Sequence, residues 1–499
     1  MRQMKRFVWL ILLFLLCTGC KKQEYIKENK TVVLQTQFRQ AVINRCKVTD
    51  CYEETYVNTV SALLEEQKKA GDYDMDHPLF ILNPYGTTPN MVYIYLGQTK
   101  ERPYISYEVK VPKTNIPSFF RNFYLPVDIN EQGSISVEGL LAGLIEGVVN
   151  ELHLFIKDET GTIQKEQTYL LDLRESSPSK EIEQVVFYQA EEEKIPKEGL
   201  FCCSVNLPNE SGYLFYDNYG ILRARIAAKE VIAYGKVLAA GNHLFYASGQ
   251  EEYVLVDYCG KVKKRFYQDS KEVIQDYVYD EEAQTILVLT CDKKSGKPYF
   301  YSIDPIDGDI KTLNTNLIQE NFHYVEKQLL GSRISIKMLQ KGDCLLSGSQ
   351  TEDVFRINHL YTQPVVRWML SSDNDAEQIV TLSGTMAKYR GICSISDSNE
   401  KKQPKDSLSF GILAKTNNQA WFDVLSVDES YHMFSSKGRF CLGSAAEILS
   451  AHTYGKHLIV GKSQEIGEYN TEGQLILSLT FSKPTILNVQ KMTMSRYWF

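Results

Sequence analysis

The chain has 499 residues, of which 43% are hydrophobic and 23% are charged, a composition typical of folded proteins rather than disordered ones. Its net charge of -7 argues against nucleic acid as a partner, because phosphate backbones select strongly basic surfaces. At about 150 residues per domain, this length predicts two or three domains. The 31 tyrosines and 22 phenylalanines favour strands over helical bundles, whereas only 8 histidines limit the chemistry that is available.

Residues 1–20 resemble a bacterial lipoprotein signal peptide. Basic side chains precede the apolar run 7–16, which is too short to span a bilayer but has the length of a signal-peptide core. Thr18 and Gly19 then lead to Cys20, which this resemblance makes the lipidated N-terminus. The sequence therefore predicts an extracytoplasmic protein of the bacterial cell envelope, held to the membrane by a lipid anchor at Cys20. A plain secretory signal with an incidental cysteine is the alternative.

Eleven cysteines less Cys17 and Cys20 leave nine, an odd number, so at least one thiol is free or bonded elsewhere. Their pairing stays open. Cys202 and Cys203 are adjacent, so we expect one to be buried and the other to face the surface. None of the spacings is that of a zinc site, and we expect neither a metal nor a cofactor.

Three segments follow the signal. Residues 21–72 are expected to form a polar tether and then one or two helices, since apolar residues recur at helical spacing between positions 31 and 70. Residues 79–173 hold short apolar runs separated by Gly, Pro and Asn, which predicts a β-sandwich of immunoglobulin type. Residues 174–197 are polar and charged and are expected to be a linker. The strands expected in the sandwich include 91–95, 104–111, 151–157 and 168–173.

From residue 198 to residue 499 the sequence repeats an alternating apolar run that ends in Asp or Asn and is followed by Gly. Successive Asp positions are 40 and 47 residues apart, a period typical of β-propeller blades. About 300 residues at this period predict six blades, and a β-sandwich array or a solenoid is the alternative. The copies pair Asp217 with Gly220, Asp257 with Gly260, Asp304 with Gly308 and, more weakly, Asn470 with Gly473.

The segment Asn83-Pro-Tyr-Gly-Thr-Thr-Pro89 resembles the start of the N-terminal domain of bacterial arylsulfate sulfotransferases. This resemblance covers roughly residues 79–499. It implies an all-β fold, a six-bladed β-propeller preceded by an immunoglobulin-like β-sandwich and a short N-terminal helical segment. The segments that resemble the family's opening, central and last blades are 213–225, 253–266, 345–350, 354–357, 366–370 and 473–481.

The resemblance also implies a chemistry. The family moves a sulfuryl group from a phenyl sulfate to a phenol without 3'-phosphoadenylyl sulfate, through a histidine nucleophile at the propeller centre. Attack on sulfur needs a nucleophilic imidazole, and the sulfuryl oxygens need cations or hydrogen-bond donors. An acid must also protonate the departing phenolate, which histidine can do near neutral pH.

The residues that the resemblance would make catalytic are replaced in this chain. Gln275 and Asp276 stand where the family has a histidine before an aspartate, and Ser349 and Gln350 end the segment where it has Ser-Ser-Arg-His. The nucleophile should fall near 383–386, which also lacks a histidine. Glutamine can donate a hydrogen bond, but it can neither attack sulfur nor shuttle a proton. We therefore expect these four residues to bind a ligand and not to catalyse.

His323 is the one substitute nucleophile, because it precedes the central blade in the right order, and Arg333 is the cation that would accompany it. Four other histidines flank blade strands or turns, and we expect them to be structural or exposed. They are His243, His432, His452 and His457.

Three functional hypotheses follow. In the first, the chain is an envelope lipoprotein that keeps the arylsulfate sulfotransferase fold but has lost catalysis, and that binds a phenolic or aryl sulfate ligand, or a partner. In the second, it is an active sulfotransferase with a rearranged site. In the third, it is an envelope scaffold without a small-molecule site. The sequence leaves open whether the protein forms a homodimer.

Overall fold

The structure is a computed structural model of the whole chain, and it describes residues 29–32 and 50–493 with short gaps. The expected signal peptide and Cys20 lie outside the described residues. The gaps are 100–103, 124–126, 130–134, 159, 175–184, 190–198, 208–209, 233–234, 268, 314–319, 341, 372–379, 385–388, 390, 398–406 and 484–485.

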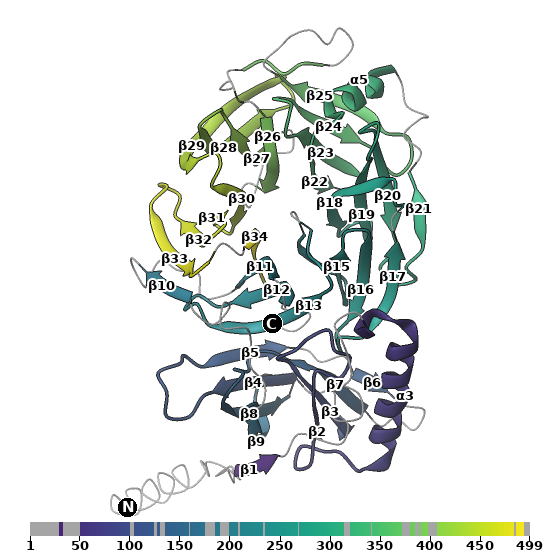
Figure 1. The fold of residues 1–499 in the computed structure, drawn as a ribbon, viewed down its shortest axis with the longest axis vertical. Coiled ribbons are helices and arrows are strands. Elements are labelled where there is room, and N and C mark those ends of the chain that lie inside the picture. Colours follow the sequence, from purple (N-terminus) through teal and green to yellow (C-terminus); the bar gives the residue numbers. More distant parts are fainter. Residues whose placement is uncertain are drawn as a thin grey trace, which may run out of the picture.

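The described chain is an all-β structure with two main helices (Figure 1). The first helix, α3 (Glu54–Ala70), follows the short η2 (Asp50–Tyr52) and buries Val57, Val60 and Leu64. This spacing of three and four residues places the three side chains on one helix face. The second helix, α5 (Glu320–Leu329), packs against two strands that follow it in the chain, at 343–348 and 365–370.

The N-terminal part contains two sheets, which enclose much of the hydrophobic core of this part of the chain. One has the strand order β1-β9-β8-β4-β5 and the other β2-β3-β7-β6. The strands of the first sheet are β1 (Asn29–Val32), β9 (Ile163–Asp172), β8 (Val149–Lys157), β4 (Tyr104–Lys110) and β5 (Phe119–Phe123). Those of the second are β2 (Leu79–Leu82), β3 (Val92–Thr99), β7 (Ile135–Leu141) and β6 (Val127–Ile129).

The rest of the described chain forms six sheets arranged around a common centre, which is a propeller-like arrangement (Figure 1). Each runs antiparallel from an inner strand to an outer strand. The first sheet holds β14 (Val237–Ala240), β15 (His243–Gly249), β16 (Glu252–Asp257) and β17 (Val262–Tyr267). The second sheet holds β18 (Glu272–Asp280), β19 (Thr285–Asp292), β20 (Pro298–Ile303) and β21 (Ile310–Thr312). The third sheet holds β22 (Ile334–Gln340), β23 (Asp343–Gly348), β24 (Val354–Asn358) and β25 (Val365–Leu370).

The fourth and fifth sheets continue the ring and the sixth closes it. The fourth sheet holds β26 (Gly391–Asp397), β27 (Ser407–Lys415), β28 (Gln419–Asp428) and β29 (Met433–Ser444). The fifth sheet holds β30 (Ile448–Tyr454), β31 (His457–Lys462), β32 (Glu465–Tyr469), β33 (Leu475–Phe481) and β10 (Val185–Gln189). The sixth sheet holds β34 (Ile486–Met492), β11 (Leu200–Leu207), β12 (Glu210–Tyr216) and β13 (Leu222–Ala228). The sixth sheet therefore joins the two ends of the chain segment that forms the ring, because β34 is its inner strand and β11, β12 and β13 complete it.

The inner strands of neighbouring sheets contact one another in order, from β14 to β18, β22, β26, β30 and β34. Side chains of β34 complete the circle, because Asn488 donates to the carbonyl of Gly235 at 3.2 Å and Gln490 donates to that of Val237 at 2.7 Å. These bonds hold the two ends of the ring together.

The repeated Asp-to-Gly segments are the turns of outer hairpins. In the turn after β16, Asp257 Oδ1 accepts from the backbone N–H groups of Cys259 and Lys261, both at 3.0 Å. Gly260 has φ +81°, a left-handed conformation that glycine adopts without steric cost. Asp217, Asp304 and Asn470 accept from backbone N–H groups in the same way. The repeat is therefore a turn motif of the fold.

The sequence predictions for the N-terminal part are confirmed only in part. The four expected strands are present as β3, β4, β8 and β9. One or two helices were expected between residues 31 and 70, and the described part of that segment holds η2 and α3. Its first residues lie instead in β1, which pairs in parallel with β9. Residues 33–49 lie outside the described part of the chain.

The expected linker, 174–197, is also corrected. Residues 185–189 form strand β10, which pairs antiparallel with β33 along the edge of the fifth sheet. Val185 and Phe187 alternate with side chains that face solvent, since an edge strand is covered on one face only. The charged residues on both sides of this short strand conceal its alternation in the sequence.

Both adjacent cysteines are buried, contrary to expectation. Cys202 and Cys203 lie in the interior strand β11, where one faces the core shared with the N-terminal part and the other faces the core shared with the fifth sheet. A strand in the ring is covered on both faces, so alternation does not expose either side chain. The free cysteines of the described chain include Cys202, Cys203, Cys259, Cys291, Cys344, Cys393 and Cys441.

Candidate functional site: the central cavity

A cavity of about 350 Å³ lies at the centre of the ring and is lined by all six inner strands. Each strand contributes residues two positions apart, which point to the same face of a strand. Figure 1 shows these strands at the inner edge of the sheets. The pairs are Lys236 and Leu238, Asp276 and Val278, Ser335 and Lys337, Ser394 and Ser396, Ser450 and His452, and Asn488 and Gln490.

Among these lining residues, the cations outnumber the carboxylates. Lys236, Arg333 and Lys337 are cationic and Asp276 is the one carboxylate, which leaves two positive charges in excess when His452 is neutral. Lys236 Nζ lies 2.6 Å from Asp276 Oδ1, so this pair is neutral as a unit. Arg333 and Lys337 are the other two cations of the lining. A half-enclosed cavity with this excess attracts anions.

Hydroxyl and amide groups supply the polar part of the lining, and several of them already bind the backbone. Ser335 Oγ accepts from Ile395 N at 3.2 Å, and Ser450 Oγ accepts from Val489 N at 3.1 Å. Such bonds fix neighbouring inner strands against each other. The apolar part of the lining includes Leu238, Val278 and Leu449. The cavity therefore combines a cationic side, fixed polar groups and an aliphatic surface.

His452 is the histidine of this lining. It is half-buried on β30, and its Nε2 accepts a hydrogen bond from the backbone N–H of Lys491 at 2.9 Å. Burial, and then the charge of Lys236, lower the pKa of His452 to about 4. The ring is therefore neutral at neutral pH, with its proton on Nδ1 because Nε2 acts as the acceptor. Neither nitrogen then offers a free lone pair for attack.

Of the four residues expected to bind a ligand, Asp276 lines the cavity and is already engaged. Its Oδ2 accepts a hydrogen bond from the backbone N–H of Ile336 at 3.1 Å, and its Oδ1 accepts one from Lys236 Nζ. Gln275 is the extra residue of a bulge in β18, and its Oε1 accepts from Ile334 N at 3.3 Å. Both side chains thus join β18 to β22. Gln275 is not among the residues that line the cavity.

Ser349 and Gln350 lie at the end of β23 and hold the turn that carries Arg333. Ser349 Oγ accepts from Arg333 N at 3.0 Å, and Ser349 N donates to Arg333 O at 2.8 Å. Gln350 Nε2 donates to the carbonyl of Gly331 at 3.1 Å. Neither residue lines the cavity. The structure therefore brings them to Arg333 as positioning residues.

The proposed substitute nucleophile is in α5, and its cation directly precedes β22. His323 lies in α5, a helix that packs against β23 and β25, and its side chain is outside the described part. Arg333 lines the cavity at the start of β22. Of the other histidines, His457 Nδ1 lies 2.6 Å from Glu468 Oε1, and His359 and His432 have positive φ in turns. Of these three, His432 and His457 were expected to be structural or exposed, and their positions agree with that expectation.

Sequence reasoning missed His452, which was expected to flank a strand, and it also missed Lys236, Lys337, Asn488 and Gln490. The signal that could have found them is the polar pair two residues apart at the start of each repeat, such as Asn488 and Gln490. It is weak because each copy holds different polar residues. The Asp-to-Gly turns mark the outer hairpins instead.

The described residues contain no cluster of three or more His, Cys, Asp or Glu side chains that could hold a metal ion. Of the helices in the described part, none is both long and apolar enough to cross a bilayer.

No protein-family model and no curated protein matches the chain. Among solved structures, it is similar to BamB from Moraxella catarrhalis, with 12% identity, a TM-score of 0.31, and 60% of this chain and 92% of that chain covered. It is similar to TolB from Acinetobacter baumannii, with 11% identity, a TM-score of 0.34, and 68% of this chain and 78% of that chain covered. It is also similar to a functionally unknown protein from Desulfotomaculum acetoxidans, with 10% identity, a TM-score of 0.36, and 69% of this chain and 96% of that chain covered. The strand order itself, and not these likenesses, defines the fold described above.

Proposed function

We propose that the chain is a six-bladed propeller with an immunoglobulin-like N-terminal domain, related to the arylsulfate sulfotransferases, that binds a phenolic or aryl sulfate anion without transferring its sulfuryl group. The observation that carries this proposal is the cavity lining. It supplies cations for an anion, but its histidine has no lone pair directed to a substrate.

The size and chemistry of the cavity suit such a ligand. A volume of about 350 Å³ lies within the ~300–1,000 Å³ range of small-molecule sites. Arg333 and Lys337 can hold sulfuryl oxygens, because guanidinium and ammonium groups form the stronger, charge-assisted hydrogen bonds. Leu238, Val278 and Leu449 offer an aliphatic surface to the aryl ring.

The state of His452 argues against sulfuryl transfer. A nucleophilic imidazole needs one nitrogen with a free lone pair near the sulfur, and usually a second group to orient it. Here Nε2 is committed to Lys491 N, and the low pKa leaves the ring without the extra proton near neutral pH, so it cannot act as the acid for the departing phenolate. An active enzyme would need another nucleophile, for which His323 is the sequence candidate.

The test is release of 4-nitrophenolate from 4-nitrophenyl sulfate in the presence of phenol. The proposal predicts no release above that of buffer for the purified full chain. Turnover that is lost in His323→Ala would contradict it and favour the rearranged enzyme. Turnover that is lost in His452→Gln would also contradict it and would make His452 the nucleophile.

The lipid anchor is proposed on the N-terminal sequence alone. Cys20→Ser should abolish incorporation of labelled palmitate and release the protein from membranes, since the thiol is the lipidated group. Retained label in the variant would contradict the anchor and favour a plain secretory signal.

A further inference from the structure

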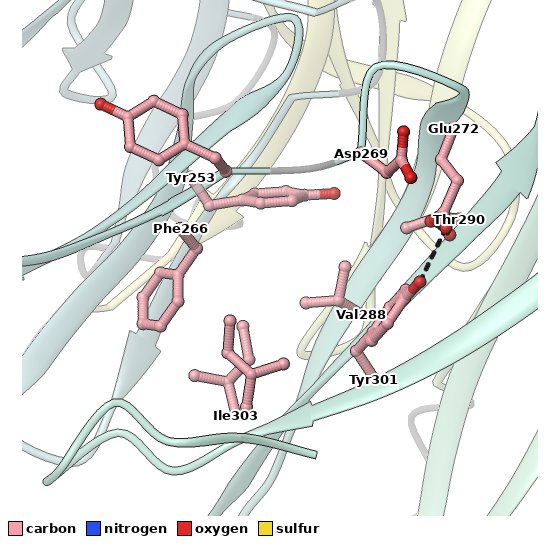
Figure 2. A pocket seen from close by; sticks show the side chains of 10 residues that line it. Tyr253, Phe266, Asp269, Glu272, Val288, Thr290, Tyr301 and Ile303 are labelled. Atoms are coloured by element: carbon pink, nitrogen blue, oxygen red, sulfur yellow. Dashed lines mark hydrogen bonds between the residues drawn. The ribbon is translucent and has the colours of Figure 1, made fainter. Parts of the chain in front are cut away.

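A second pocket lies between the outer parts of two neighbouring sheets and shares no lining residue with the central cavity (Figure 2). Its volume is about 130 Å³. That is close to the ~150 Å³ of an engineered apolar cavity that accepts benzene. We call it the aromatic pocket, and it has room for one small ring.

Side chains from both sheets make most of this lining apolar. Tyr253 and Phe266 come from the first sheet, and Val288, Ile303 and Ile310 come from the second. Among the described residues that line the pocket there is no lysine or arginine. An anion would therefore lose its hydration here without gaining a cation in exchange. The lining suits a ligand that is mostly hydrocarbon.

The carboxylates of the aromatic pocket are engaged within the protein. Glu272 accepts hydrogen bonds from Thr290 Oγ1 and from Tyr301 OH, the second at 2.8 Å. Asp269 lies in the exposed loop after β17, and it accepts from the backbone N–H of Lys271 at 2.9 Å. These bonds tie β18 to β19 and β20 and shape the loop. We therefore give neither carboxylate a role in holding a ligand.

Tyr253 carries the observation that points to a ligand. Its side chain is buried, with 3% exposure, and its hydroxyl has no hydrogen-bond partner among the described residues. The ring stacks on Phe245 at 5.3 Å and meets Tyr277 edge to face at 5.6 Å, so packing on both sides holds it in place. Figure 2 shows the Tyr253 ring reaching into the pocket toward the side that holds Glu272 and Thr290. Buried hydroxyls are rarely left without a partner, and a ligand in the pocket would supply one.

We propose that the aromatic pocket binds a small neutral alcohol whose hydrocarbon part is about the size of one six-membered ring. The hydroxyl of the alcohol bonds to the hydroxyl of Tyr253. Each of these groups can both donate and accept, so the bond can form in either direction. The hydrocarbon part lies against Phe266, Val288 and Ile303. Because the Tyr253 hydroxyl is already out of water in the free protein, this bond costs it no further desolvation.

The test is a calorimetric titration of the full chain at constant ionic strength with cyclohexanol, benzene and cyclohexylammonium chloride. Cyclohexanol should bind with one-to-one stoichiometry and at least about fivefold more tightly than benzene, because benzene has no hydroxyl for Tyr253. It should also bind more tightly than cyclohexylammonium, whose charge loses its hydration in an apolar pocket. Equal affinity for benzene would overturn the hydrogen bond, and tighter binding of cyclohexylammonium would overturn the neutral ligand. The absence of saturable cyclohexanol binding would overturn the site itself.

Two tyrosine variants make the assignment specific. Tyr253→Phe keeps the ring and should weaken cyclohexanol binding about fivefold or more, while benzene binding should not change. Tyr267→Phe is the matched control, because Tyr267 also lines the pocket but is 64% exposed. This variant should bind cyclohexanol like the wild type.

Urea denaturation of Tyr253→Phe tests the premise separately. Since the Tyr253 hydroxyl has no partner to lose, the variant should be at least as stable as the wild type. A destabilised variant would show that the hydroxyl is bonded inside the protein. Unchanged cyclohexanol binding in a stable variant would place the ligand elsewhere. Either result would overturn the proposal.

Discussion

Buried charges in this molecule bind the backbone of distant segments together. Arg223 on β13 is 1% exposed and pairs with Asp217 at 2.7 Å. It also donates to the carbonyl of Pro117 at 2.6 Å and to that of Gly143 at 3.3 Å, both in the N-terminal part. A single guanidinium thus satisfies acceptors from three segments, which its planar array of donors allows.

Removing this group should destabilise the fold strongly. We expect Arg223→Gln to lower the free energy of unfolding by about 3–5 kcal/mol, since it leaves a buried carboxylate without its cation. Arg174→Gln is the matched control, because Arg174 forms an exposed pair with Asp172, and exposed ion pairs contribute little to stability. Urea denaturation measures both, and equal losses in the two variants would contradict the role of Arg223.

His452 predicts a pH dependence. Its folded pKa of about 4 lies below the ~6.5 of an exposed imidazole, so between these values the unfolded chain binds the additional proton. The stability that His452 contributes is therefore present above about pH 6.5 and is lost as the pH falls toward 4, by up to about 3 kcal/mol.

The measurement is the unfolding midpoint of the wild type and of His452→Gln at pH 7 and pH 5. Burial raises the pKa of Asp257 to about 6 and gives a trend of the opposite sign, but both proteins share it. The variant should therefore lose less stability between the two pH values. Parallel curves would show that His452 does not titrate as described.

At the scale of elements, the close approach of neighbouring sheets depends on small residues. A Cβ atom added to Gly391 at the start of β26 would lie 1.9 Å from the carbonyl oxygen of Ser349, which is backbone and cannot swing aside. Ser349 in turn holds Arg333 at the cavity. The space at Gly391 therefore sets how the third and fourth sheets meet beside the site.

We expect Gly391→Ala to destabilise the protein by at least about 1–3 kcal/mol, the usual cost of overpacking. Gly438→Ala, in strand β29, is the control, because an added Cβ there would meet its nearest neighbour at an ordinary 3.6 Å. Thermal unfolding of the two variants tests the difference, and a Gly391→Ala protein as stable as the control would refute the close contact.

The elements also explain what the sequence could predict. The turns of the outer hairpins were predictable, because Asp257 and Gly260 have a fixed local chemistry that recurs in each copy. The cavity was not, because its lining comes from six strands whose residues are brought together by ring closure alone. Asp276 was found and Gln275 misjudged for the same reason, since only the bulge in β18 decides which of the two side chains faces the centre.

At the scale of the whole molecule, the N-terminal part and the ring share one hydrophobic core. This core runs from α3 through the two N-terminal sheets to β12, β15 and β16. Thr87 Oγ1 donates to Gly260 O at 2.5 Å, and Arg225 pairs with Glu146 at 2.7 Å across the same boundary. The N-terminal part therefore supports the ring from below, in the view of Figure 1, and leaves the central cavity to the inner strands.

The central claim is that this cavity binds an aryl sulfate without converting it. Calorimetric titration of 4-nitrophenyl sulfate into the wild type, Arg333→Ala and Lys437→Ala tests it most directly, with Lys437 as an exposed cation on β29. The account predicts that the wild type binds 4-nitrophenyl sulfate with one-to-one stoichiometry and releases no 4-nitrophenolate. Arg333→Ala should weaken this binding about tenfold or more, and Lys437→Ala should leave it unchanged. The absence of binding to the wild type, or equal binding to Arg333→Ala, would contradict it.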